Sequence, residues 1–189
     1  MRNQIWSHCF WIRKSSAFAV LISVVCCTYG QTKSAARSIS LNERVQQQAN
    51  LMGQAFLKAD YQTFARYTYP ALLSAMGGEN RMAATLTQTV SDMGAKGMTF
   101  SSIIVNSPTK IVKSGNELQC TLQQHTTIKL TNGRAVATST LIAISKDGGK
   151  DWLFVDTSNK DAAAMRKALS NLSAAIVIPP QQKPLFYSF

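Results

Sequence analysis

The chain is poor in the residues that build disulfides, metal sites and acid–base centres. It has four cysteines and two histidines, and three of these cysteines and one histidine lie before Thr28. Beyond that point Cys120 has no partner for an internal disulfide, and His125 has no second histidine or cysteine at the spacing of a metal site. The sequence therefore predicts a fold that depends on its hydrophobic core, and we expect no metal and no cofactor.

Apolar runs long enough to cross a bilayer are also missing. The stretch from Ala17 to Cys27 is apolar but shorter than the roughly 20 residues that a membrane-spanning helix needs. Arg2, Arg13 and Lys14 precede it without any acidic residue, which is the pattern of a secretory signal peptide. We expect the protein to be exported, to the periplasm or outside the cell, with no transmembrane segment in the mature chain.

The cleavage site follows from the small residues at the end of this stretch. Thr28 and Gly30 occupy the −3 and −1 positions of a cut before Gln31, so residues 1–30 are the predicted signal peptide. An uncleaved anchor is one alternative, and a lipid attached at Cys26 or Cys27 is another. The residues before these two cysteines are not the small ones that lipid attachment sites prefer.

Negative charge is scarce. Nine acidic residues face 20 lysines and arginines, which gives a net charge of +11, and the leader removes only three of the cations. The remaining cations are spread singly, and no basic run carries the interleaved aromatic residues that single-stranded nucleic acid stacks on. We expect no specific nucleic-acid partner, only a general attraction for anionic surfaces.

The helical pattern begins after a small, polar stretch at 31–39 that we expect to be a flexible linker. Ser40 followed by Glu43 is a capping box, which predicts a helix of about 18 residues from there. Asp60 is the predicted cap of a second helix, and Pro70 interrupts the pattern. Further helices are predicted over 79–95 and about 159–172. The apolar stripe of the first helix comprises Leu41, Val45, Ala49, Met52, Phe56 and Ala59.

From Met98 the apolar period changes to two, which indicates strands over 98–105, 117–130, 134–146 and 152–156. The turn at 131–133 sets the register of the two longest strands. A two-residue Asn-Gly loop and a three-residue loop with Gly133 in a bulge are both common. We expect the three-residue loop, because it places Ile128 opposite Val136 and Leu122 opposite Ile142.

That register predicts which polar residues lie on the face that the helices cover. It places Gln124 and Thr126 beside Thr138 and Thr140 there, and it turns His125 to the opposite, polar face. Cys120 falls on the covered face, where a free cysteine acts as a small apolar residue.

Helices followed by a curved antiparallel sheet resemble the nuclear transport factor 2-like superfamily, which is also called cystatin-like or cone-shaped. Several segments look like an exported branch of it of Bacteroidetes type. These segments are Ala55-Phe56, Tyr67-Thr68-Tyr69-Pro70, Gly77-Gly78-Glu79, residues 145–156, Ile178-Pro179 and Pro184. The resemblance implies one α+β domain over 40–189, with N-terminal helices packed on the sheet, a short C-terminal helix and an extended tail.

Folds of this kind enclose a pocket between helices and sheet, and the resemblance implies one here. The favoured function is a non-catalytic module that binds a small apolar or amphipathic ligand, or another protein. The candidate pocket residues are Tyr61, Phe64, Tyr67, Gln124, Thr126, Thr138 and Thr140.

The alternative is a pocket enzyme, an isomerase, lyase or hydrolase, that uses a tyrosine and an aspartate as acid and base. No catalytic residue is assigned, because the available carboxyl groups have simpler structural roles. The candidates for this pair are Asp60, Asp92 and Asp156 with Tyr61, Tyr67 and Tyr69.

A homodimer through the sheet is a further expectation. Both faces of the strand at 152–156 carry apolar residues, so both need a cover. The predicted register gives the hairpin an outer face of small residues that suits packing against a second copy. That face comprises Ala135, Ala137, Ser139, Leu141 and Ala143.

Overall fold

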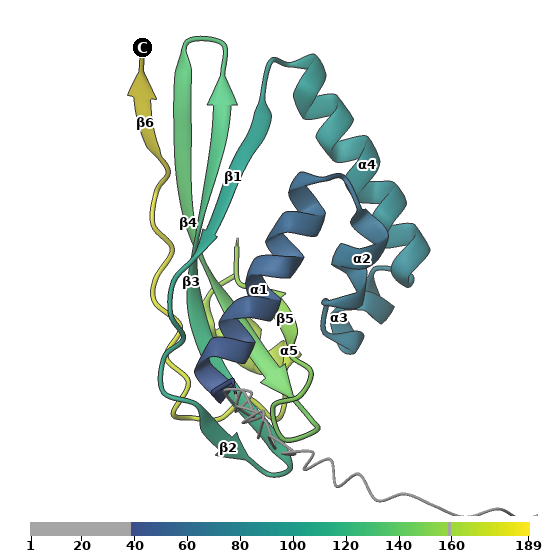
Figure 1. Cartoon of the computed structure of the whole chain (residues 1–189), viewed down its shortest axis with the longest axis vertical. Coiled ribbons are helices and arrows are strands. Elements are labelled where there is room, and N and C mark those ends of the chain that lie inside the picture. Colours follow the sequence, from purple (N-terminus) through teal and green to yellow (C-terminus); the bar gives the residue numbers. More distant parts are fainter. Residues whose placement is uncertain (1–38, 159) are drawn as a thin grey trace, which may run out of the picture. The chain divides into compact units, whose positions relative to one another are not determined.

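The structure is a computed structural model that describes residues 39–158 and 160–189. The predicted signal peptide (1–30) and residues 31–38 of the predicted linker lie outside the described residues. The described part has the predicted α+β fold: N-terminal helices pack against a six-stranded antiparallel sheet, and a short helix lies near the C-terminus (Figure 1).

Helix α1 (Leu41–Leu57) begins with the predicted capping box. The Ser40 hydroxyl accepts a hydrogen bond from the backbone N–H of Glu43 at 3.2 Å, and the Glu43 carboxylate accepts one from the Ser40 N–H at 2.9 Å. These bonds satisfy two donors at the end of the helix. The stripe of Val45, Ala49 and Met52 is buried against the sheet, as the spacing predicts.

The next helices also begin at residues that the sequence marks. The carboxylate of Asp60 accepts a hydrogen bond from Thr63 N–H at 3.0 Å and so caps α2 (Tyr61–Arg66). This bond lowers the pKa of Asp60, because it favours the charged form. Pro70, predicted as an interruption, is the first residue of α3 (Pro70–Ala75), a position where no N–H is needed. Helix α4 (Glu79–Ala95) has the predicted bounds.

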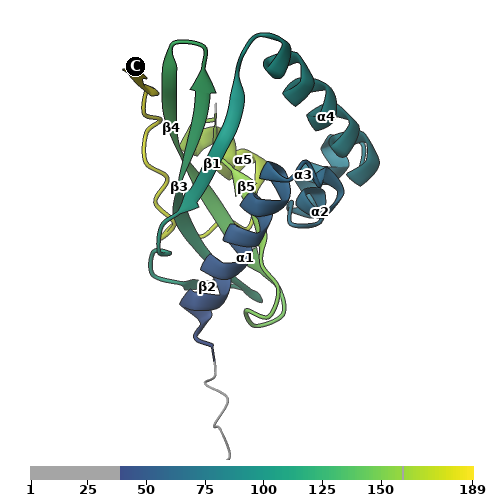
Figure 2. The same cartoon turned by 45° about the horizontal axis from the view of Figure 1, so that its top comes forward.

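The sheet has the strand order β1-β3-β4-β5, with β2 paired to β3 and β6 paired to β4. Its strands are β1 (Thr99–Val105), β2 (Val112–Ser114), β3 (Glu117–Leu130), β4 (Gly133–Ser145), β5 (Leu153–Asp156) and β6 (Leu185–Ser188). The long β3–β4 hairpin forms its centre (Figure 2).

The predicted register of this hairpin is wrong. Leu130 pairs with Gly133 across a two-residue turn, so Leu122 lies opposite Leu141 and Cys120 opposite Ala143. The prediction matched the apolar residues of β3 to those of β4 as though only one face of the sheet were covered. Other segments of the chain pack against both faces, and each face has its own set of apolar residues.

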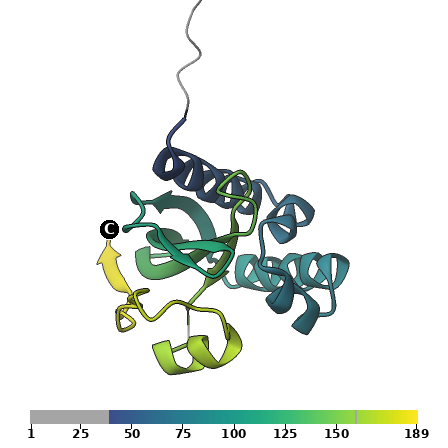
Figure 3. The same ribbon diagram turned by 90° about the horizontal axis from the view of Figure 1, so that it is seen from below.

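We call the face of the sheet that packs against α1 the helix-covered face and the opposite one the outer face. The helix-covered face includes Cys120, Leu122, Leu141 and Ala143, which pack with Val45 and its neighbours on α1. The outer face is covered over part of its length by α5 (Ala162–Ala168) and the segment after it (Figure 3). This second cluster contains Ile142, Ile144, Val155, Met165, Leu169, Ile176 and Ile178.

The same shift corrects the surface predicted for a dimer. Leu141 and Ala143 belong to the core beneath α1. Side chains alternate along a strand, so Ala135, Ala137 and Ser139 also face the helices rather than a second copy.

Two glutamines attach distant segments to the sheet region. The side chain of Gln48 on α1 donates to the carbonyl of Lys150 and accepts from the N–H of Trp152, both at 2.7 Å. Gln119 on the outer face donates to the carbonyl of Asn171 at 3.0 Å and accepts from the N–H of Ser173 at 2.9 Å. These bonds hold α1 and the C-terminal segment in place against the sheet region.

Candidate functional site

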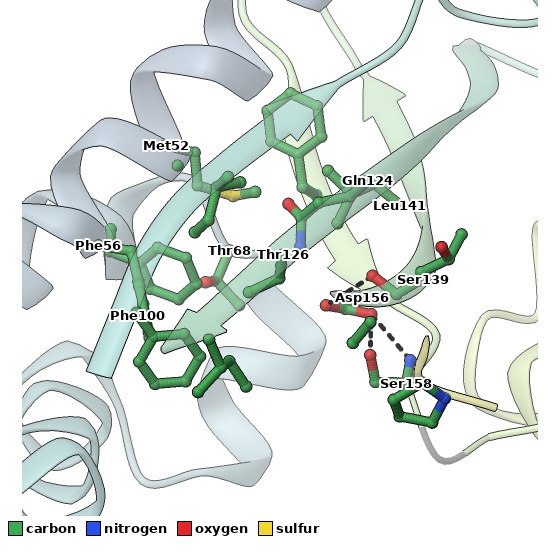
Figure 4. A pocket seen from close by; sticks show the side chains of 18 of the residues that line it. Met52, Phe56, Thr68, Phe100, Gln124, Thr126, Ser139, Leu141, Asp156 and Ser158 are labelled. Carbon is green, nitrogen blue, oxygen red and sulfur yellow. Dashed lines mark hydrogen bonds between the residues drawn. The ribbon is translucent and has the colours of Figure 1, made fainter. Parts of the chain in front are cut away.

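A cavity of about 520 Å³ lies between the helices and the helix-covered face. This volume is within the range of about 300–1,000 Å³ that is usual for small-molecule sites. Figure 4 shows side chains that line it. The lining comes from α1 to α4, from strands β1, β3, β4 and β5, and from the C-terminal tail at Gln181, Gln182 and Pro184.

Most of the wall is apolar, and its centre is an aromatic cluster around Phe56. The ring of Phe56 meets Phe64 at 5.4 Å and Phe100 at 4.9 Å between centroids, in edge-to-face geometry. Met52 and Met82 add flexible apolar surface that adapts to irregular shapes. This part of the cavity suits the apolar body of a ligand.

A bulge in β1 brings two further apolar residues to the wall. The pairing of β1 with β3 shifts between Phe100 and Ser102, so that both Phe100 and Ile103 face the cavity. Strict alternation would have placed them on opposite faces. The close approach of β1 to α1 also needs Gly53, because a Cβ there would lie 2.9 Å from the Ile103 Cγ2.

The floor carries a buried amide that has no protein partner. Gln124 is only 8% exposed, and its side chain makes no hydrogen bond within the part of the chain that the structure describes. Every fully enclosed side-chain nitrogen or oxygen in that part has a partner. The amide of Gln124 is therefore accessible from the cavity, and Figure 4 shows it among the lining side chains.

Two hydroxyl groups accompany this amide. Thr68, which is 5% exposed, and Thr126 both line the cavity, and neither hydroxyl bonds to another group among the described residues. Buried polar groups are almost always hydrogen-bonded in folded proteins. The floor thus offers three polar groups to whatever fills the cavity.

One side of the cavity is more strongly polar. The carboxylate of Asp156 accepts hydrogen bonds from the N–H and the hydroxyl of Ser158 at 2.8 and 2.7 Å, both at Oδ1. Its other oxygen, Oδ2, accepts a longer one from the Ser139 hydroxyl at 3.4 Å. Gln181 continues this rim and donates to the carbonyl of Thr157 at 3.3 Å.

The backbone of β4 contributes to the same rim. Strand β5 pairs with β4 at Leu141–Ile144, and β6 pairs with it at Gly133–Val136. Between them, residues 137–139 have no strand on that side in the described structure. Thr138 lines the cavity at this gap although its hydroxyl bonds to His125 Nδ1 at 3.0 Å on the outer face.

The predicted pocket residues fall into two groups. Phe64, Gln124, Thr126 and Thr138 line the cavity. Thr140 does not line it: the corrected register places Thr138 and Thr140 on the outer face, so the expectation that they share a face with Gln124 is wrong. This expectation failed for the same reason as the predicted register: segments of the chain pack against both faces of the sheet rather than one.

The two predicted tyrosines are structural neighbours of the cavity rather than part of its lining. Tyr61 packs edge-to-face on Phe56 at 5.6 Å, and Tyr67 lies 6.4 Å from Phe154 between ring centroids. Sequence reasoning missed Phe100 and Ser139 as lining residues, because one depends on the bulge and the other on the register. It considered Asp156 only as a possible acid at the end of a strand.

The tyrosine–aspartate pair expected of an enzyme is not formed within the described residues. Asp60 caps α2, and Asp92 accepts a hydrogen bond from Gln88 at 2.7 Å on α4. Asp156 is held by serines rather than by a tyrosine.

Cys120 and His125 are absent from the described lining of the cavity. Cys120 is fully buried, and burial raises the pKa of its thiol to about 12, so it is protonated at neutral pH. His125 lies on the outer face, where its Nε2 is 3.3 Å from the side-chain nitrogen of Asn106. Neither is placed to act on a molecule in the cavity.

Within the described residues, no group of three or more histidines, cysteines and carboxylates is arranged to hold a metal ion. In the same part of the chain, no helix combines the length and the apolar character required to traverse a bilayer. Compared with known proteins, the chain matches no family model, no curated protein and no solved structure.

Proposed function

We propose that this protein is a non-catalytic binding module that holds a small amphipathic molecule in the cavity between its helices and its sheet. The order of elements, helices first and then an antiparallel sheet with a cavity beneath the helices, supports a nuclear transport factor 2-like fold. The N-terminal sequence pattern supports export, so the ligand would be met in the periplasm or outside the cell.

The observation that carries the proposal is the amide of Gln124. An amide that is fully buried without a partner costs about 1–3 kcal/mol in proteins, and the Gln124 amide, which is 8% exposed and faces the cavity, carries part of this cost. A leucine at the same position would avoid this cost and fill more of the cavity. A chain that keeps both the amide and the open volume is better explained by a ligand that supplies the missing hydrogen bonds than by a structural core.

An enzyme of the tyrosine–aspartate type has less support. Asp156, the one carboxylate among the described residues that line the cavity, is engaged by Ser139 and Ser158. Tyr61, Tyr67 and Tyr69, the tyrosines considered for this pair, are absent from its lining. Binding requires none of this chemistry.

The test is the binding of Nile red, an uncharged apolar dye whose fluorescence rises when it leaves water, to the full chain. Ala137→Phe would fill the cavity from its floor, and we expect it to weaken binding about tenfold or more, through overpacking of the space the dye needs. Val136→Phe is the matched control, because Val136 is the neighbouring residue of β4 and points to the outer face. It should bind the dye as the unchanged chain does.

Two results would contradict the proposal. One is the absence of any saturable Nile red binding to the unchanged chain. The other is equal binding by the Ala137→Phe variant, provided its circular dichroism shows that it is folded, because the dye would then occupy another surface.

A further inference from the structure

The charged side chain in the cavity lining has the opposite sign to the net charge of the chain. The chain carries a net charge of +11. Yet among the described residues that line the cavity, Asp156 is the only one with an ionisable side chain, and no lysine, arginine or histidine is included. The fixed charge that a bound molecule meets directly is therefore negative.

The carboxylate of Asp156 has acceptor capacity left for a ligand. An ionised carboxylate offers about four lone-pair positions. Oδ1 takes two short hydrogen bonds from Ser158, whereas among the described residues Oδ2 takes only the 3.4 Å contact from Ser139. Asp156 pairs with Leu141 at the end of β5, and both residues line the cavity.

The apolar and polar parts of the cavity lie at different places along it. In Figure 4, Phe56 and Phe100 lie on one side, Asp156 and Ser158 on the other, and Thr126 between them. A ligand that satisfied both regions would place its apolar body against the aromatic cluster and its head group at Asp156. Gln124 and Thr126 would then contact the section nearer the head.

The chemistry of this head group follows from the absence of a cation. A carboxylate or phosphate head would bring a second negative charge next to Asp156, and the described lining has no positive side chain to offset the repulsion. A protonated amine would instead form a charge-assisted hydrogen bond to Oδ2, which is stronger than a bond between neutral groups. The positive charges elsewhere on the surface are weakened by salt over about 8–10 Å.

Resting on the proposed function, we propose that the ligand class is an apolar molecule that ends in a protonated amine, which binds at Asp156. An uncharged head that donates a hydrogen bond, such as an alcohol, binds less tightly, and an anionic head binds least. This assignment is specific to the polar rim and does not follow from the existence of the cavity alone.

The experiment compares dodecylamine, dodecanol and dodecanoate as competitors of Nile red, each below the concentration at which it aggregates. The three share one apolar chain and differ only in the head. Asp156 is exposed, and an exposed ion pair raises affinity by about fivefold at most. We therefore expect dodecylamine to compete about fivefold more strongly than dodecanol. The carboxylate should be the weakest competitor.

Substitution of the carboxylate tests its role. Asp156→Asn removes the charge but keeps an oxygen that accepts from Ser158, and the amine-to-alcohol ratio should fall to about one. Asp151→Asn is the control: Asp151 is an exposed carboxylate outside the cavity lining, and its removal should leave the ratio unchanged. For the unchanged chain, added sodium chloride should reduce the ratio, which provides a second measurement if the variant fails to fold.

The outcomes separate this inference from the proposed function. If Nile red binds in the cavity but the three competitors act equally, or dodecanoate acts best, or Asp156→Asn keeps the ratio, the inference is overturned and the binding function stands. If Nile red does not bind at all, the binding function itself fails and the inference fails with it.

Discussion

Two buried glutamines on β3 allow a direct test of whether the cavity floor is a site or part of the core. Gln119 is 0% exposed on the outer face, and its side chain bonds to Glu117, Asn171 and Ser173. Gln124 is 8% exposed on the helix-covered face and has no such bond among the described residues. Replacing each by leucine should change the free energy of unfolding in opposite directions.

The magnitudes follow from what each substitution leaves behind. Gln119→Leu leaves the N–H of Ser173 without its partner. It also removes one bond each from the carbonyl of Asn171, which keeps the Ser114 hydroxyl, and from the carboxylate of Glu117, which keeps Lys146. At about 1–3 kcal/mol for the unsatisfied N–H and about 0.5–1.5 kcal/mol for each of the two other lost bonds, we expect a loss of about 2–6 kcal/mol. Gln124→Leu leaves no group of the described residues unpaired and removes an amide that has no partner among them. Because that amide retains access to the cavity, we expect a gain of about 0.5–1.5 kcal/mol, below the full cost of burial.

Urea unfolding of both variants and of the unchanged chain, without added ligand, measures these differences directly. The same Gln124→Leu variant should bind Nile red or dodecylamine with a changed affinity, because the floor of the cavity is altered. The reasoning is refuted if Gln124→Leu destabilises the chain as much as Gln119→Leu. That result would mean that the amide has a structural partner and that the floor is ordinary core.

Three further predictions concern residues around the cavity. Burial raises the pKa of the Cys120 thiol to about 12, above its value in the unfolded chain. The contribution of the protonated thiol to the free energy of unfolding is therefore complete below the unfolded pKa and is lost as the pH rises towards 12. Urea unfolding across that alkaline range should therefore show a shallower loss for Cys120→Ala than for the unchanged chain. Gln48→Ala removes both hydrogen bonds from α1 to the β4–β5 turn, and its thermal unfolding should reveal a loss of about 1–3 kcal/mol. Gly53→Ala should lower stability by about 1–3 kcal/mol in urea unfolding through its clash with Ile103, whereas Gly94→Ala, which meets no atom within 4 Å, should not lower it.

The helices could be predicted well because their signals are local. The caps at Ser40 and Asp60 act over three residues, and both are formed as predicted. Helix α4 begins directly after Gly77 and Gly78, which adopt φ angles of +87° and +92° that favour glycine. The final helix is shorter than predicted, Ala162–Ala168, and the tail after it is extended.

The site was harder to predict because its geometry depends on distant parts of the chain. The register of β3 and β4 could not be deduced from their own pattern, since Ile142 is buried by Met165 and Ile176, which come later in the sequence. The bulge that turns Phe100 into the cavity has no glycine to mark it. Gln124 and Thr126 were found because they interrupt an apolar face, a signal that survives an error in register.

The gap in pairing along β4 gives the rim a property that side chains cannot provide. At residues 137–139 the edge of the strand is bordered by neither β5 nor β6, so peptide groups form part of the boundary of the cavity. Peptide N–H and C=O groups are retained whatever residue occupies a position, with proline as the exception for the donor. Mutations at these positions can alter the shape of the rim and its selectivity. They leave its main-chain hydrogen-bonding pattern intact, so related chains with different side chains here would still present the same polar edge.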